Sequence, residues 1–113
     1  MSMAFDPKAP ADAATIAALR DEHGEVFAHD DFPGVIFSRP SRAAWKRFKS
    51  AVLDPKLQAG ATDNLFADVV LYPAHGTSEC KALLDKYPAA SDVIAEMAAA
   101  LARGEDAARA KKL

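Results

Sequence analysis

The spacing of hydrophobic residues changes at Pro40 and divides the chain into two kinds of structure. On the N-terminal side, residues 25–29 and 34–38 are rich in β-favouring side chains, and the segment 30–33 between them contains turn-forming Asp and Pro residues. We therefore predict a two-stranded β-hairpin. Pro40 cannot continue a strand ladder, Ser41 is a good helix cap, and the apolar residues that follow recur at helical spacing. A helix is predicted to begin directly after the hairpin.

Three further helices are indicated by apolar periodicity together with start and stop residues. Residues 12–23 form the first, which Gly24 ends, and residues 78–86 form a short second one. The last helix has Pro88 in its first turn and ends before Gly104. Each prediction combines an apolar stripe with a residue that favours a helix terminus.

The segment before Tyr72-Pro73 is open to two interpretations. A helix capped by Thr62 or Asp63 is predicted to run to about Leu71, where Tyr72-Pro73 ends it. The run 69–72 could instead form a strand, because periodicity cannot distinguish short β-branched runs. We favour the helix.

The whole pattern predicts one α+β domain over residues 1–113, mostly α-helical. Its N-terminal helix and two-stranded β-hairpin are followed by about four helices, and 113 residues suffice for one core but not for two. Residues 1–10 and 105–113 are expected to be flexible ends. Because many apolar residues are alanines, the core depends on a few large side chains. These are Ile16, Leu19, Val26, Val35, Ile36, Phe37, Trp45, Phe48, Val52, Leu65, Phe66, Val69, Leu83, Leu84, Tyr87, Ile94, Met97 and Leu101.

Basic residues gather around the predicted helix after Pro40, although the chain has a net charge of −2 and a pI near 5.9. No acid lies between Arg39 and Leu53. These cations either neutralise acidic segments of their own fold or form a docking surface for an acidic partner. The mildly acidic chain lacks the broad basic footprint of a nucleic-acid-binding protein. The candidate partner-binding residues are Arg39, Arg42, Lys46, Arg47 and Lys49.

Candidate catalytic groups are few and do not form a known pattern. Cys80 is the only cysteine, so no internal disulfide can form, and we expect a small buried or half-buried thiol. His23, His29 and His75 have no metal-ligand spacing with it, and the Asp30-Asp31 pair beside His29 suits a turn. We expect no enzymatic activity, no cofactor and no metal.

Membrane and export signals are also missing from the pattern. No segment approaches about 18 apolar residues, and the N-terminus lacks the basic start and apolar run of a signal peptide. We expect a cytosolic protein without membrane contact.

Several short motifs occur in a characteristic order between about residues 12 and 104. In chain order they are Gly24-Glu25-Val26, an apolar strand, Arg39-Pro40-Ser41-Arg42-Ala43 with Trp45-Lys46-Arg47-Phe48, Leu65 to Tyr72-Pro73, and Leu83 to Tyr87-Pro88. This order resembles the small tail assembly chaperones of tailed bacteriophages and prophages. Ala44 stands where similar sequences often carry Glu, and its small side chain cannot supply a capping carboxylate.

The resemblance implies a protein of the host cytoplasm that binds the long tape-measure protein, keeps it soluble and helps to recruit tail tube protein. Such a role requires exposed binding surfaces, and a helical protein can provide them by packing a helix against a helical partner. Self-association into a homo-oligomer would also bury apolar surface. Two alternatives stay open, a small virion structural or connector protein and a regulatory module that binds nucleic acid.

Overall fold

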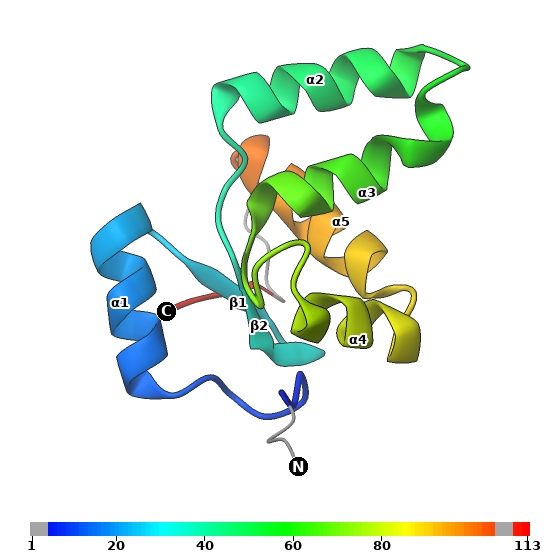
Figure 1. The fold of residues 1–113 in the computed structure, drawn as a ribbon. Helices are drawn as coiled ribbons and strands as arrows, with labels where there is room; N and C mark the ends of the chain where they lie inside the picture. The colour runs from blue at the N-terminus through cyan, green and yellow to red at the C-terminus, as the bar shows by residue number, and fades with distance from the viewer. Residues whose placement is uncertain (1–4, 106–109) are drawn as a thin grey trace.

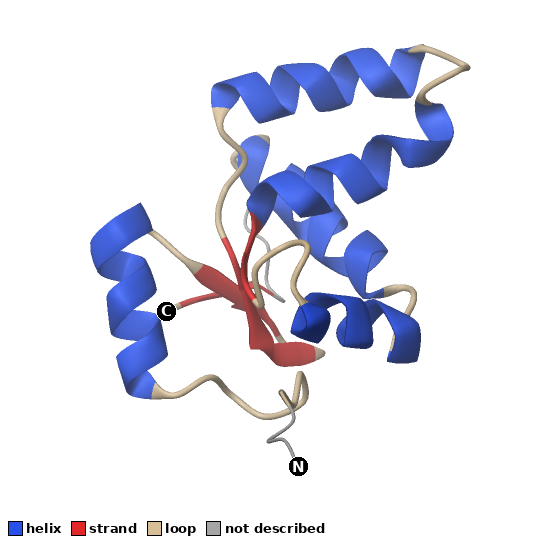
Figure 2. Cartoon of the chain, in the orientation of Figure 1, coloured by secondary structure: helices blue, strands red, loops and turns tan. Residues whose placement is uncertain are grey.

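Five helices and a four-stranded antiparallel sheet form the structure (Figures 1 and 2). The computed structural model describes residues 5–105 and 110–113. The predicted class, mostly helical α+β with a helix, a hairpin and four further helices, is confirmed. The helices are α1 (Ala13–His23), α2 (Arg42–Leu53), α3 (Gln58–Val69), α4 (Ser78–Lys86) and α5 (Ala90–Ala102). The strands are β1 (Phe27–His29), β2 (Phe32–Phe37), β3 (Val70–Tyr72) and β4 (Ala110–Lys112).

The sheet separates α1 from the other helices. Figure 1 shows α1 on one side of the strands, α3, α4 and α5 on the opposite side, and α2 farther out beyond α3. Helix α3 packs against both α5 and α2, and α5 also contacts β2. Helix α2 is therefore tied to the body mainly through α3. Within the described residues, no helix is long and apolar enough to cross a membrane.

The predicted hairpin forms, but its turn is shorter than expected. Strands β1 and β2 pair antiparallel, and only Asp30 and Asp31 form the turn. The Asp31 amide donates a hydrogen bond to His29 Nδ1 at 3.0 Å, which closes the turn locally. Phe32 and Pro33, predicted to lie in the turn, belong to β2 instead. Phe32 is buried there, with its ring edge-on to Tyr87 at a centroid distance of 5.5 Å.

Residues 70–72 form a strand, so the helical prediction for this segment was wrong. Helix α3 ends at Val69, and β3 pairs with β2 at one edge of the sheet, in the order β3-β2-β1-β4. The open edge of β2 supplies hydrogen-bond partners that a lone sequence window does not reveal. The start of the helix was also misplaced, because α3 begins at Gln58, whose amide donates to the Asp54 carbonyl at 2.9 Å.

Both predicted flexible ends contact the sheet. Residues 110–112, expected to fray, pair with β1 as the edge strand β4, and Leu113 N donates to the Val26 carbonyl. At the other end, Pro7 accepts a hydrogen bond from Gly34 N at 3.0 Å. A Cβ on Gly34 would lie 2.6 Å from two backbone oxygens of this leader, so the contact requires glycine. Residues 1–4 and 106–109 lie outside the described residues.

The core confirms most of the large residues nominated from the sequence. Val26, Val35–Phe37, Leu65, Phe66, Val69, Leu83, Ile94 and Leu101 are all buried. Trp45, Phe48, Leu84, Tyr87 and Met97 are only partly buried and pack against the core from outside. Two buried phenylalanines, Phe27 and Phe32, were not nominated.

Three nominated core residues were misplaced. Val52 is 40% exposed at the end of α2. Ile16 and Leu19 are half-buried on α1, a helix with no fully buried residue. Helix α1 lies on the side of the strands away from α3, α4 and α5 (Figure 1), so its apolar stripe contributes little to the main core.

Candidate protein-binding surface

Helix α2 begins where the sequence predicts. Ser41 has extended backbone dihedrals, and its hydroxyl accepts a hydrogen bond from Ala44 N at 3.1 Å. No acidic residue lies in the first turn. At the other end, the Gln58 side-chain amide donates to the Val52 carbonyl at 2.8 Å. Side chains therefore satisfy backbone groups at both ends of this helix.

The inner face of α2 packs on α3. Ala44 is buried, and Phe48 and Ala51 line a narrow groove opposite Ala61 and Leu65 of α3. The ring of Trp45 stacks on that of Phe48 with centroids 5.4 Å apart. Small residues on both helices allow close approach, and they orient α2 so that its opposite face is turned to solvent.

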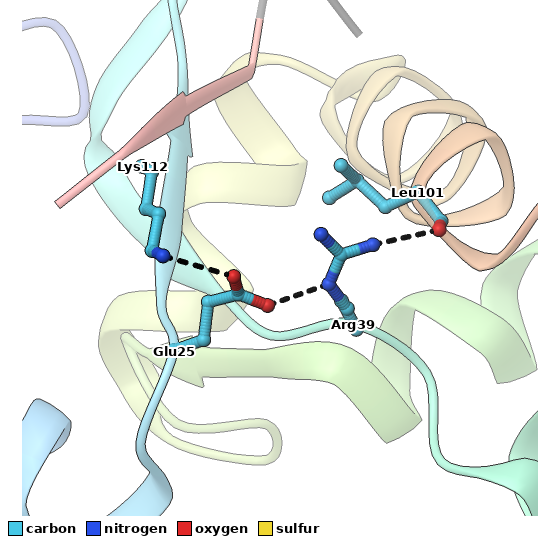
Figure 3. Close-up of polar contacts among 4 residues, drawn as sticks. All are labelled: Glu25, Arg39, Leu101 and Lys112. Atoms are coloured by element: carbon cyan, nitrogen blue, oxygen red, sulfur yellow. Dashed lines mark hydrogen bonds and ion pairs between the residues drawn. The ribbon is translucent and has the colours of Figure 1, made fainter. Parts of the chain in front are cut away.

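Two of the five candidate cations are engaged within the fold. Arg47 pairs with Asp68 of α3 at 3.0 Å across the exposed edge of the α2–α3 interface. Arg39 forms an ion pair with Glu25 and donates from its guanidinium to the Leu101 carbonyl at 2.8 Å (Figure 3). Its guanidinium also lies 5.4 Å from the centre of the Phe27 ring. Each of these side chains joins α2 or its leading loop to a neighbouring part of the chain.

The Arg39 contacts tie together segments far apart in sequence. Figure 3 shows the Glu25 carboxylate between Arg39 and Lys112 of β4, whose ammonium lies 3.2 Å away. The hydrogen bond from Arg39, with a further one from Lys112, holds the pKa of Glu25 below its ordinary value. Through the Leu101 carbonyl, Arg39 also caps the C-terminal turn of α5. Because these contacts join the segment before β1, the loop before α2, the end of α5 and β4, they indicate a structural role for Arg39.

The other three candidates, Arg42, Lys46 and Lys49, form the outer face of α2. All three are exposed. Their spacing of i, i+4 and i+7 places them on one side of the helix, opposite Ala44 and Ala51. None of them takes part in a hydrogen bond or ion pair among the described residues. Like charges at this spacing repel one another, and the described part of the chain places no carboxylate against them as an ion-pair partner.

An exposed leucine at the end of α2 continues this face, a second one follows in the corner before α3, and the sequence interpretation missed both. Leu53 is 82% exposed and Leu57 54% exposed, at the corner between α2 and α3. The Asp54 carbonyl accepts from Leu57 N and Gln58 N, each at 2.9 Å, so the corner is an ordered turn. The spacing did contain a signal, because Leu53 follows Lys49 by four positions and so lies on the same side of α2.

Comparisons with known proteins assign no family to this chain. No family model matches this chain, and neither a curated protein nor a solved structure is significantly similar to it.

Within the described residues, the cysteine, histidine and acidic side chains do not come together in one metal-binding or catalytic site. Within residues 5–105 and 110–113, no group of three or more His, Cys, Asp or Glu side chains is arranged to hold a metal ion. Cys80 is buried in the core, as predicted, and burial raises the pKa of its thiol. A raised pKa disfavours the thiolate, which is the reactive form. The buried His29 accepts from the Asp31 amide within the hairpin turn. Among these groups, the described geometry supplies no activated nucleophile paired with a base.

Proposed function

We propose that this protein is a non-enzymatic tail assembly chaperone, which binds the tape-measure protein in the host cytoplasm and assists tail tube assembly. The observation that carries the proposal is the positive outer face of α2, formed by Arg42, Lys46 and Lys49, which has no ion-pair partner among the described residues. The order of sequence motifs supplies the identity of the partner. Arg39 and Arg47 are left out of the contact surface because both are engaged with carboxylates of the protein itself.

A protein partner fits this face better than nucleic acid does. The three cations lie within eight residues of helix, and the outer two are about 10 Å apart at a rise of about 1.5 Å per residue. Counterion release favours a much wider basic footprint, and the chain as a whole is acidic. A short row of cations on one helix face instead matches a row of acids on a partner helix.

The test combines charge reversal with a matched control. The variant Arg42→Glu, Lys46→Glu, Lys49→Glu is compared with Arg20→Glu, Lys81→Glu, Lys111→Glu, which changes the charge equally at scattered exposed positions. Binding to the tape-measure protein of the same phage is measured by calorimetry. We expect the first variant to weaken binding by ~10-fold or more and the control to bind like the wild type. Raising salt should also weaken the wild-type complex, because salt screens exposed charges.

Two results would count against the proposal. If the α2 variant stays folded and binds with normal affinity, the outer face is not the binding surface. If it unfolds while the control does not, the cations serve the protein's own acidic segments. As a further check on the role, a chaperone should be absent from purified virions, whereas a structural or connector protein would be present.

A further inference from the structure

The outer face of α2 changes from positively charged to apolar toward the C-terminal end of the helix. At a rise of about 1.5 Å per residue, Lys46, Lys49 and Leu53 lie about 6, 10 and 16 Å along the helix axis from Arg42. Three cations are thus followed, one turn later, by the most exposed large apolar residue of the described chain. Leu57 and Val52 extend this apolar end, and we define Val52, Leu53 and Leu57 as the apolar corner.

The apolar corner belongs to an ordered turn and not to a frayed helix end. Asp54 accepts backbone hydrogen bonds from Leu57 and Gln58, and its carboxylate accepts a third, from Lys56 N at 2.9 Å. The side-chain amide of Gln58 donates a separate hydrogen bond to the Val52 carbonyl and so holds the last turn of α2. An ordered turn that presents leucines to water loses little conformational entropy when a partner covers them.

We infer that the outer face of α2 and the apolar corner form one continuous dock for an acidic amphipathic helix. The partner's acids would lie against Arg42, Lys46 and Lys49, and its apolar residues, one turn farther on, would cover Leu53 and Leu57. This inference rests on the proposed function and deepens it, because it specifies the order of acidic and apolar residues in the bound segment.

Charge and shape favour this occupant over two others. A second copy packed through the same face would bring two rows of cations together, which is unfavourable. A membrane surface requires an apolar face along the whole helix. In α2 that face, with Ala44, Phe48 and Ala51, is turned toward α3, and the large apolar side chains that α2 exposes, Val52 and Leu53, lie at its corner end.

The experiment uses synthetic helical peptides as probes against the full chain. The matching peptide carries Glu at positions i, i+4 and i+7 and Leu at i+11 and i+14. One comparison peptide replaces both Leu by Ser, and another replaces the Glu residues by Lys. Affinities are measured by calorimetry for the wild type, for Leu53→Ser with Leu57→Ser, and for Leu53→Met with Leu57→Met. The Met variant is the matched control because it keeps the apolar surface.

We expect the wild type to bind the matching peptide at least ~10-fold more tightly than either comparison peptide. The Ser variant should lose ~10-fold or more in affinity for the matching peptide, and the Met variant should stay within ~3-fold of the wild type. Circular dichroism should show all variants folded, since both leucines are largely exposed.

The outcomes separate this inference from the proposed function. If the Ser variant binds the matching peptide normally while reversal of the three cations abolishes binding, the apolar corner is not part of the dock and the charged face still is. If neither change weakens binding to the peptide or to the tape-measure protein, both ideas fail. Self-association of the wild type that the Ser variant loses would assign the corner to a second copy. Binding to vesicles containing phosphatidylserine, lost in the Ser variant, would assign it to lipid. Either of these last two results overturns the inference.

Discussion

Replacing Leu53 or Leu65 by Ala makes the same chemical change at two opposite positions of the α2–α3 hairpin. Leu65 lies on α3 and is 1% exposed, whereas Leu53 at the end of α2 is 82% exposed. Removing a buried leucine side chain costs its transfer free energy and leaves a cavity, together about 2.7–5 kcal/mol. We therefore expect Leu65→Ala to lower the free energy of unfolding by that amount.

The cost at Leu53 is much smaller. Full burial of a leucine contributes about 1.5–3 kcal/mol, and Leu53 buries only about a fifth of its side chain, which gives at most about 0.5 kcal/mol. No cavity forms at an exposed site, and Ala is at least as good a helix former. Leu53→Ala should therefore leave the stability nearly unchanged.

Urea unfolding followed by far-ultraviolet circular dichroism measures both variants against the wild type. Thermal melts provide a second measurement. For a domain of this size, about 1 kcal/mol corresponds to about 4 °C in Tm, so the Tm of Leu65→Ala should lie ~10–20 °C below that of the wild type. Leu53→Ala should melt within ~2 °C of the wild type. A loss above about 1 kcal/mol at Leu53 would show that the corner packs against the protein itself. The apolar corner would then be no candidate for a partner site.

Three further predictions follow from single contacts. Arg39→Ala should raise the pKa of Glu25, which NMR titration measures. Since Glu25 has a lowered pKa in the folded state, its contribution to stability is present above its unfolded pKa and lost as pH falls. The stability difference between wild type and Arg39→Ala should therefore shrink from pH 7 to about pH 3 in urea unfolding, and a difference independent of pH would refute an ionic role for Arg39. Cys80 should react with a thiol reagent at pH 8 at least ~100-fold more slowly than in urea-unfolded chain, because the folded thiol is buried; equal rates would place it at the surface. Gly34→Ala should displace the leader and speed hydrogen exchange at amide 34, since the added Cβ would meet two backbone oxygens at 2.6 Å; unchanged exchange would show that the leader does not dock there.

The sequence determined features that depend on a few neighbouring residues. Ser41 caps α2 and Gly24, with a positive φ of 82°, ends α1, because these conformations and hydrogen bonds are local. The strands of the hairpin were likewise recognisable, although the tighter turn was not. The grouping of Arg42, Lys46 and Lys49 on one face follows from helical periodicity alone. For the same reason the candidate site could be outlined before its surroundings were known.

Tertiary structure decided what depends on distant partners. The strands β3 and β4 form because β2 and β1 offer open edges with which they can pair. The sequences of the short segments 70–72 and 110–112 do not by themselves show that these edges are available. The five cations look alike in sequence, yet Arg39 meets Glu25 and Leu101, which are 14 and 62 residues away, and Arg47 meets Asp68, 21 residues away. Only the packing of α2 on α3 shows which cations and which leucines stay exposed. Burial and charge pairing are properties of the folded chain, because they are set by residues that meet only when the helices pack.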